Sequence, residues 1–309
     1  MAEGKPMFRK LALIGIGLIG SSIALGAKKK NLVAEIAIAT RSKETLAKAK
    51  ALGLGNRYFT DPAQAVDGAD LVILCTPVGA FRGIGKAIQQ YLGADTILTD
   101  VGSVKTHVQQ ALGPIMPSYV NFVPGHPVAG TEHSGPEAGF AELFEGRWCI
   151  LTPLPTSKSQ AVAKLAEFWK ALGSNVEIMD AAHHDLVLAI TSHVPHLIAY
   201  NIVGVADELE DVTKGEVIKY SASGFRDFTR IAASDPVMWR DVFLTNRDAV
   251  LEMLGRFTED LTALQKMVRN GDGDGLEKLF TRTREIRRSI VEAGQDTAAA
   301  DFGRRAKKP

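Results

Sequence analysis

The first 180 residues alternate short apolar runs with longer stretches in which apolar residues recur at helical spacing. Most of the short runs are apolar along their whole length, which is typical of strands covered on both faces. Alternation of such strands with helices predicts a parallel sheet with crossover helices. The predicted strands are Leu11–Ile14, Glu35–Ala39, Leu71–Cys75, Thr96–Thr99, Phe122–Val123, Cys149–Leu151 and Val176–Ile178, and the predicted helices are Ser21–Lys30, Lys43–Leu52, Phe81–Leu92, Lys105–Ile115 and Ser157–Leu172.

After about Asp180 the strand pattern stops and only helical spacing remains. One series of apolar residues recurs at intervals of 3 and 4, which places its members on one stripe of a long helix. Such a stripe needs an apolar partner, either in the same domain or in a second copy of the chain. We therefore predict an α/β domain over residues 7–180 and an all-helical dimerisation domain over 181–300. The stripe consists of Val250, Leu254, Phe257, Leu261, Leu264 and Val268.

Composition excludes several classes of protein. The 309 residues carry 36 Lys plus Arg against 35 Asp plus Glu, so no surplus of cations is available for a nucleic-acid backbone. Cys75 and Cys149 are isolated in the sequence and form neither a disulfide framework nor a CxxC pair. We expect a small-molecule partner and a reducing, cytoplasmic setting.

Two apolar segments offer an alternative to the cytoplasmic interpretation. Residues 9–27 have the basic start and apolar middle of a secretory signal, but their glycines are spaced as a strand, turn and helix would need. Leu186–Ala206 is long enough to cross a membrane, yet it carries Ser192, His193 and His196, whose burial in lipid would be costly. We expect a buried helix there and no membrane partner.

A glycine motif follows the first predicted strand directly. In Gly15-Ile16-Gly17-Leu18-Ile19-Gly20 the first glycine allows a tight turn, and the second lets backbone amides approach a pyrophosphate. The third lets helix and strand pack closely, and the helix N-terminus then faces the phosphates. An ordinary glycine turn is the alternative, but the flanking strand and helix favour a dinucleotide site in a Rossmann-type, mostly parallel sheet domain. The expected cofactor-binding residues are Gly15, Gly17, Leu18, Ile19 and Gly20.

The end of the second strand discriminates between the two nicotinamide cofactors. Enzymes that prefer NAD usually present Asp or Glu there to bind the ribose hydroxyls. Here the chain reads Thr40-Arg41-Ser42, and a guanidinium beside hydroxyls suits a 2′-phosphate. We predict NADP over NAD, with Arg41 as an ordinary surface charge the alternative. Thr76, Pro77 and Val78 leave the strand Leu71–Cys75 at its C-terminal end and are expected to cover the cofactor.

Two residues outside the glycine motif are candidates for chemistry and binding. His126 follows the strand Phe122–Val123, where a histidine beside a nicotinamide could take a proton as a hydroxyl becomes a carbonyl. A structural histidine is the alternative. Arg230 lies among apolar neighbours such as Phe228 and Ile231, where an unpaired charge is costly, so a carboxylate of the protein or of a substrate should pair with it.

The helical region also contains a pair of histidines three residues apart. His193 and His196 could bind a metal together with His183 or Asp185, but no HExxH or comparable signature completes a site. We predict no metal. One of the two histidines is expected in the core and the other in contact with a polar ligand.

Five further segments follow the glycine motif in a fixed order: Asp100–Lys105, His126–Glu132, Ser192–His196, Gly224–Ala232 and Ser234–Asp241. Together with that motif they resemble the prephenate and arogenate dehydrogenases of tyrosine biosynthesis, also called cyclohexadienyl dehydrogenases. The resemblance covers most of the chain. It implies oxidative decarboxylation of prephenate or arogenate to 4-hydroxyphenylpyruvate or tyrosine.

The resemblance also implies roles for individual residues. His126 would accept the proton of the ring hydroxyl while hydride leaves the same carbon, and Ser103 would orient this histidine and the nicotinamide. Arg230 would anchor a substrate carboxylate, with His196 and Thr131 nearby. Family members are usually dimers joined through their helical domains, which suits the unpartnered stripe, and a pocket that accepts tyrosine as product makes inhibition by tyrosine plausible.

Substrate preference depends on the group near the substrate's side chain. A carboxylate there would favour the amino group of arogenate and repel the keto acid of prephenate. Glu132 and Glu137 are candidates, and we assign Glu137 to this substrate contact as a hypothesis. Two alternatives remain: an NADP-dependent oxidoreductase of the β-hydroxyacid dehydrogenase type, which would use a lysine base, and a non-catalytic NADP-sensing protein.

Overall fold

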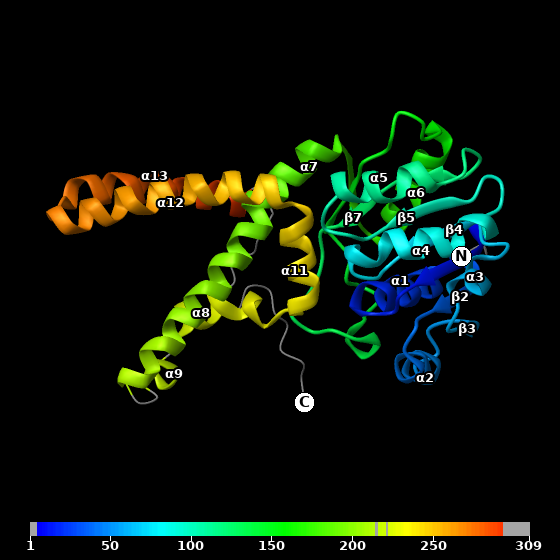
Figure 1. Ribbon diagram of the computed structural model, residues 1–309, viewed down its shortest axis with the longest axis horizontal. Coiled ribbons are helices and arrows are strands. Elements are labelled where there is room, and N and C mark those ends of the chain that lie inside the picture. The colour runs from blue at the N-terminus through cyan, green and yellow to red at the C-terminus, as the bar shows by residue number, and fades with distance from the viewer. Residues whose placement is uncertain (1–4, 214–215, 221, 293–309) are drawn as a thin grey trace. The chain divides into compact units, whose positions relative to one another are not determined.

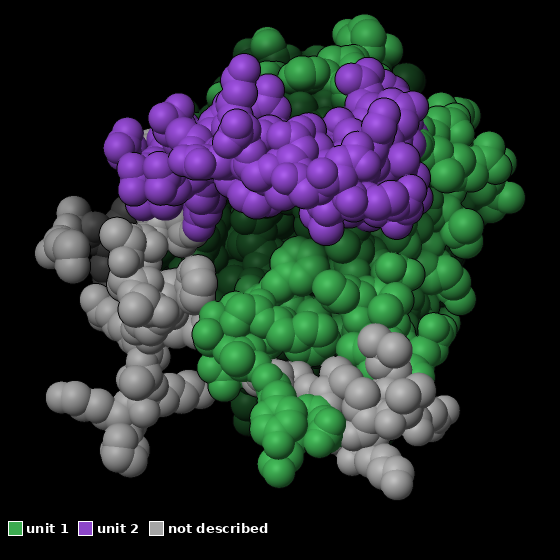
Figure 2. All heavy atoms as spheres, turned by 90° about the vertical axis from the view of Figure 1, so that its left-hand side faces the viewer, with its two compact units in different colours: residues 1–251 green, residues 252–309 purple. Residues whose placement is uncertain are grey.

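The computed structural model describes residues 5–213, 216–220 and 222–292 (Figure 1). The chain divides into two compact units, residues 1–251 and 252–309 (Figure 2). All strands described below belong to the first unit. The end of the predicted helical domain, residues 293–300, lies outside the described residues.

The first unit is organised around a six-stranded parallel sheet with strand order β3-β2-β1-β4-β5-β6. The order reverses between β1 and β4, and ligands bind at the carboxyl ends of strands at such a switch point. The predicted Rossmann-type fold is therefore confirmed. The strands are β1 (Phe8–Ile14), β2 (Val33–Ala39), β3 (Arg57–Phe59), β4 (Leu71–Leu74), β5 (Ile97–Asp100) and β6 (Asn121–Phe122).

Helices cover both faces of this sheet, as the apolar strands require. Leu11 and Leu13 of β1 pack on one face with residues of α1 (Leu18–Lys29) and α6 (Ser159–Leu172). Ala12 and Ile14 point to the opposite face, because side chains alternate along a strand. That face is covered by α3 (Pro62–Val66), α4 (Phe81–Ile88) and α5 (Thr106–Leu112), while α2 (Lys43–Ala51) contributes Ala49 to the first face.

A second, three-stranded sheet carries His126. Its strands are β7 (Gly125–Pro127), β8 (Trp148–Leu151) and β9 (Asn175–Ile178), and β7 runs antiparallel to β8 while β9 runs parallel to it. The sequence placed His126 in a loop, because Gly-His-Pro has low strand propensity. In the structure His126 pairs with Ile150 across the antiparallel ladder.

After β9 the described elements are helical. Asp180 caps the N-terminus of α7 by accepting hydrogen bonds from the amides of Ala182 and His183. A π-helical turn (Ala189–His193) joins α7 to α8, an irregularity that often occurs at functional sites. The helices of this part are α7 (Ala181–Leu188), α8 (Val194–Thr213), α9 (Glu216–Lys219), α10 (Ser223–Thr229) and α11 (Pro236–Thr245), with a 3-10 turn at Arg230–Ala233.

Within the described part of the chain, one helical run, Ala181–Glu208, is long and apolar enough to cross a membrane, judged by length and composition alone. The central helix of a soluble protein can meet the same two criteria. The backbone amides of Lys105 and Thr106 donate hydrogen bonds to Asp185, which tie the start of this run to the sheet domain.

Two long helices, α12 (Arg247–Asn270) and α13 (Gly273–Glu292), follow one another with a short turn at Gly271 between them (Figure 1). The predicted apolar stripe therefore falls on a single helix, as its spacing indicated. Several apolar side chains of this pair are exposed: Leu261 is 52% and Val268 67% exposed, and Phe280 and Ile286 are each 55% exposed.

Candidate active site

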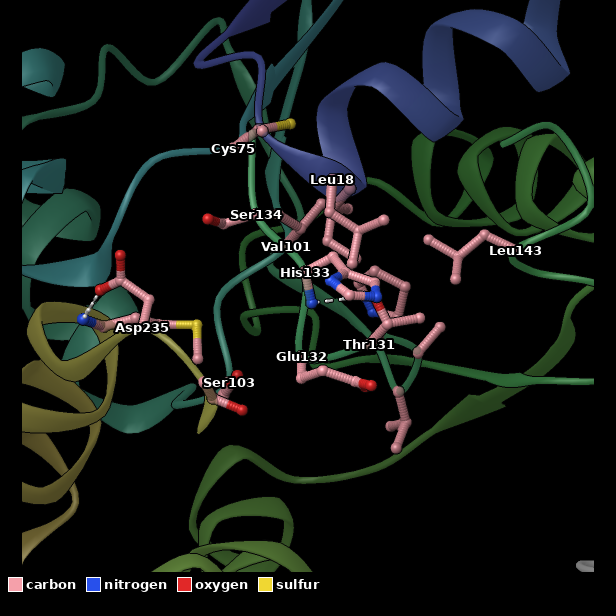
Figure 3. Close-up of a pocket in the computed structure, with 18 of the residues that line it drawn as sticks. Leu18, Cys75, Val101, Ser103, Thr131, Glu132, His133, Ser134, Leu143 and Asp235 are labelled. Carbon is pink, nitrogen blue, oxygen red and sulfur yellow. Dashed lines mark hydrogen bonds between the residues drawn. The ribbon is translucent and has the colours of Figure 1, made fainter. Parts of the chain in front are cut away.

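A cavity of about 730 Å³ lies within the first unit, at the carboxyl ends of the parallel strands and against the helices that follow residue 180. The N-terminus of α1, the segments after β4 and β5, the β7 strand with its following loop, and helices α8 and α11 line it. Figure 3 shows Leu18, Ser103 and Glu132 around this space, although they come from three separate segments. Of the predicted site residues, those that line the cavity are Gly17, Leu18, Ile19, Thr76, Pro77, Val78, Ser103, His126, Thr131, His196 and Arg230.

The glycine loop has the shape that a pyrophosphate site needs. Gly15 has a φ of +96°, and a Cβ there would stand 2.7 Å from the carbonyl oxygen of Cys75. A Cβ on Gly20 would stand 2.7 Å from the carbonyl oxygen of Gly15, so this glycine permits close packing of helix and strand. Gly17 caps α1 without a side-chain hydrogen bond, and the space above it is open. The first amides of a helix have no partner within the helix, so this helix end can bind a dinucleotide phosphate.

The predicted 2′-phosphate residues lie at the same edge of the sheet. The amide of Gly15 donates to the carbonyl of Ala39 at 2.8 Å, so the end of β2 is adjacent to the glycine loop. Thr40 and Ser42 are half-buried and Arg41 is exposed. The Ser42 hydroxyl accepts from the amide of Thr45 at 3.1 Å and caps α2. None of the three lines the cavity itself.

His126 forms the buried end of the cavity. Its Nδ1 lies 2.9 Å from Nε2 of His184, and Nδ1 of His184 lies 2.8 Å from a carboxylate oxygen of Asp185. His126 is only 6% exposed, and this burial, with the neighbouring His184, Lys105 and His193, holds its pKa well below 6.5. A neutral imidazole at neutral pH can accept a proton.

A buried ion pair supports the segments that carry Ser103 and His126. The ammonium of Lys105 donates to the carboxylate of Asp100 and, at 2.7 Å, to the carbonyl of Gly125. Asp100 also accepts from the amides of Gly102 at 2.8 Å and Gly125 at 3.2 Å. Both side chains are fully buried, so their charges are balanced only by these contacts.

The part of the cavity lining formed by Arg230 and Glu132 is partly exposed to solvent. Nη1 of Arg230 donates to a carboxylate oxygen of Glu132 at 2.9 Å, with the two side chains 40% and 29% exposed. The sequence predicted that a carboxylate of the protein or of a substrate would pair with Arg230, and in this structure that carboxylate belongs to Glu132. The pKa of Glu132 is lowered by a hydrogen bond from its own backbone amide and by Arg230.

The two histidines of the helical region have different surroundings. The ring of His196 stacks on Trp239 with centroids 3.7 Å apart, and its Nδ1 donates to the carbonyl of Ser192 at 2.7 Å. His193 is fully buried and accepts a hydrogen bond from Asn246 at 3.0 Å. Only His196 of this pair lines the cavity.

Comparison with known proteins identifies the family. The nucleotide-binding domain of prephenate dehydrogenase, as a family model, matches residues 23–178, and the dimerization domain of prephenate dehydrogenase matches residues 180–282. The chain belongs to the prephenate dehydrogenase family. It is a nucleotide-binding oxidoreductase of the prephenate and cyclohexadienyl dehydrogenase type.

Individual relatives agree with this assignment. The cyclohexadienyl dehydrogenase of Zymomonas mobilis is 41% identical over 92% of this chain and 97% of its own length. The prephenate dehydrogenase of Bacillus subtilis is 33% identical over 90% of this chain and 75% of its own. The crystal structure of Aquifex aeolicus prephenate dehydrogenase with hydroxyphenyl propionate and NAD+ superposes with a TM-score of 0.84, at 32% identity, over 91% of this chain and 98% of that one.

The structure of this prephenate dehydrogenase family member changes one expected substrate contact. Glu137 does not line the cavity; its carboxylate pairs with Lys48 of α2 at 3.4 Å, and Glu132 faces the cavity instead. The two glutamates are close in sequence, and the loop turns between them at Gly135, whose φ is +89°. Sequence spacing alone could not decide which one points inward.

Two further points concern residues around the histidines. No group of three or more His, Cys, Asp or Glu side chains in the described ranges is arranged to hold a metal ion.

His184 was not among the predicted site residues, although it contacts His126 directly. Its signal in the sequence was the His-Asp dipeptide at the start of an otherwise apolar helix.

Proposed function

We propose that the protein catalyses the NADP-dependent oxidative decarboxylation of prephenate, arogenate or both. The observation that supports this most directly is the cavity, which joins the glycine loop, a buried neutral imidazole and a partly exposed guanidinium. Oxidation of an alcohol needs a base near the hydroxyl, and a dicarboxylate substrate needs a cation away from the reacting carbon. His126 and Arg230 supply one of each.

In the proposed reaction the ring hydroxyl gives its proton to Nε2 of His126, because Nδ1 is engaged with His184. Bound NADP would supply the acceptor for the hydride that leaves the same carbon. The ring carboxylate leaves as carbon dioxide, and the electron pair of its C–C bond moves into the ring. Loss of the proton and the hydride has converted the hydroxyl to a ring carbonyl, and its oxygen receives these electrons, becomes a phenolate and takes up a proton. The aromatic product makes the reaction effectively irreversible.

Several side chains of the cavity would position the substrate. Ser103 lies on the segment after β5 and is proposed to orient His126 and the nicotinamide. Arg230 would bind a substrate carboxylate, and His196 and Thr131 also line the cavity. Since Arg230 pairs with Glu132 in this structure, substrate binding would require that pair to open or to be shared.

The NADP assignment rests on residues of this chain. Arg41 stands at the end of β2, where a carboxylate would favour NAD, and Thr40 and Ser42 flank it. A guanidinium can bind a 2′-phosphate through charge-assisted hydrogen bonds. The structure of the Aquifex relative contains NAD+, so the proposal of NADP rests on the residues of this chain and not on that relative.

The substrate assignment turns on Glu132. Its carboxylate is ionised next to Arg230 and would attract the ammonium group of arogenate more than the keto group of prephenate. The Zymomonas relative is named for the cyclohexadienyl ring that both substrates share. We therefore propose that both are accepted, with Glu132 setting the ratio in place of Glu137.

We also propose a cytoplasmic homodimer formed through the helical region. The matched dimerization domain and the exposed apolar side chains of α12 and α13, such as Val268 and Phe280, support this assembly. A second copy would cover apolar surface that water otherwise contacts. Tyrosine, which would fit the site as a product, is proposed to inhibit in competition with substrate.

One experiment tests the proposed function. The pure protein is assayed for formation of reduced cofactor in all four pairings of prephenate or arogenate with NADP or NAD, and kcat/KM is compared. We expect turnover with NADP exceeding turnover with NAD, for at least one substrate. Preference for NAD would overturn the cofactor assignment, and tight NADP binding without turnover of either substrate would indicate a non-catalytic binder.

A further inference from the structure

The ring of His126 is held by a second buried histidine. Nδ1 of His126 lies 2.9 Å from Nε2 of His184, and the two rings meet edge to face with centroids 5.1 Å apart. His184 comes from α7, is fully buried, and does not line the cavity. Its side chain therefore acts on His126 and does not reach the substrate.

Asp185 fixes the protonation of His184. Its carboxylate accepts hydrogen bonds from the amide of Lys105 at 2.7 Å and the amide of Thr106 at 2.9 Å, and it lies 2.8 Å from Nδ1 of His184. Burial opposes ionisation of this carboxyl, but these hydrogen bonds keep its pKa below the ordinary value. A carboxylate has no proton to donate, so Nδ1 of His184 must carry the hydrogen of this bond.

The tautomer of His126 follows from that of His184. Burial lowers the pKa of His184, so the ring is neutral and carries one proton, on Nδ1. Its Nε2 is then an acceptor, and Nδ1 of His126 must be the donor in the bond between the rings. This arrangement leaves a lone pair on Nε2 of His126.

We propose that His184 and Asp185 are positioning residues that hold His126 in the Nδ1-protonated tautomer, so that Nε2 can accept the proton of the substrate hydroxyl. This inference rests on the proposed role of His126 as the base. When Nε2 takes the proton, the imidazolium keeps its Nδ1 hydrogen bond to His184, and the His184 ring is polarised toward the Asp185 carboxylate. The positive charge is thus stabilised without a second proton transfer.

The same carboxylate also connects the base to the segment that carries Ser103. Lys105 and Thr106, whose amides bind Asp185, come directly after this segment and begin α5. The ammonium of Lys105 in turn binds the carbonyl of Gly125, the residue before His126. Asp185 therefore helps to fix both the tautomer of the base and its distance from Ser103.

Two substitutions of His184 separate its two hydrogen bonds. In His184→Asn the amide nitrogen stands near the position of Nδ1 and can still donate to Asp185, but the side chain is too short to reach His126. In His184→Gln the amide oxygen stands near the position of Nε2 and can still accept from His126. His183→Asn is the matched control, because the neighbouring His183 is exposed and does not line the cavity.

We expect kcat of His184→Asn to fall on the order of 10²-fold, within the range that a general base contributes, while the substrate KM changes little. His184→Gln should retain more activity than His184→Asn, and His183→Asn should match the unmodified enzyme. Equal kcat for His184→Asn and His183→Asn would overturn the inference. Cofactor affinity is measured for each variant to show that the fold is intact.

A second measurement reads the tautomer without substrate. The protein has seven histidines, so selective 15N labelling gives a short set of ring resonances, and that of His126 is assigned by its loss in His126→Asn. We expect a protonated Nδ1 and a bare Nε2 for His126, with the preference lost in His184→Asn. A protonated Nε2 in the unmodified enzyme would refute the positioning role. The expected tautomer in a protein that converts neither substrate would refute the proposed function instead.

Discussion

The part of the candidate site around His126, here called the inner end, and the part at Arg230, here called the outer end, are built in different ways. His126 lines the cavity at the inner end, and His184, Asp185 and the Lys105–Asp100 pair support it from outside the cavity lining; all are buried and make hydrogen bonds within the protein. At the outer end Arg230 and Glu132 form a pair that remains partly in water. Buried polar groups are costly to rearrange, whereas an exposed ion pair contributes little to stability and opens readily. The groups proposed for chemistry are thus fixed in advance, and those proposed for recognition can exchange partners.

The sharpest test of the inner end is His126→Asn. We expect kcat to fall by a factor on the order of 10²–10⁴, because the variant lacks a proton acceptor at this position. Dissociation constants for NADP should stay the same, since the glycine loop is untouched. Steady-state kinetics and cofactor titration measure both, and undiminished turnover would remove His126 from the reaction.

The buried ion pair should contribute mainly to stability. Lys105→Met leaves the carboxylate of Asp100 buried without its cation, which is expected to lower the free energy of unfolding by about 3–5 kcal/mol. Asp100→Asn combined with Lys105→Met should recover part of this loss, because the amide oxygen can still accept from the backbone. Denaturant unfolding compares the variants, and equal losses in the single and double variants would contradict the assignment.

At the outer end Arg230→Ala should act on binding. Loss of a charge-assisted hydrogen bond of roughly 1.5–3 kcal/mol predicts a rise of about 10–100-fold in the substrate KM, with a smaller change in kcat. Arg226→Ala is the matched control, since Arg226 is exposed on α10 and does not line the cavity. An unchanged KM in Arg230→Ala would place the substrate carboxylate elsewhere.

A smaller effect is expected for the exposed cation at the end of β2. Arg41→Ala should lower kcat/KM for NADP by about tenfold, the value of one modest charge-assisted contact, and leave kcat/KM for NAD unchanged. Arg57→Ala on β3 serves as control, because the Arg57 guanidinium is directed to Glu35 of β2, 3.9 Å from its carboxylate. Equal losses with both cofactors would show that Arg41 does not distinguish them.

The smallest expected effect is in the pH dependence of kcat/KM, which tests the burial of His126 without any substitution. Burial, with His184, Lys105 and His193 nearby, lowers the pKa of His126 well below 6.5. A base works in its deprotonated form, so kcat/KM should hold constant as pH falls through 6.5 and decline only below it. A decline centred at or above pH 6.5 would mean that His126 is more exposed in the working enzyme than in this structure.

Much of the nucleotide half of the molecule could be predicted from sequence because its signals are local. The glycine motif and the fully apolar strands specify β1, α1 and the sheet around them with little help from distant residues. Strands β3 and β7 were missed for the opposite reason. Arg57–Phe59 and Gly125–Pro127 are short, and they become strands through pairing with β2 and β8.

The residues of the candidate site show the same difference between signals that are local in the sequence and contacts that depend on distant residues. His126 and Arg230 stand out by residue type and neighbours, so sequence reasoning found them. His184 acts through a contact with a residue 58 positions away, and no spacing rule connects the two. The choice between Glu132 and Glu137 depended on the path of one loop, which the glycine at 135 redirects.

The position of His126 on a strand has a consequence for how this enzyme could diversify. Its register opposite Ile150 is fixed by the β7–β8 ladder, whereas residues 128–147 between those strands form a connecting segment that includes Glu132. Insertions or deletions around Glu132, in the part of that segment before the core residues Leu143 and Phe144, would alter what the cavity admits without displacing the base. Evolution, or a designer grafting loops of new length, can therefore vary substrate range and chemistry as separate traits.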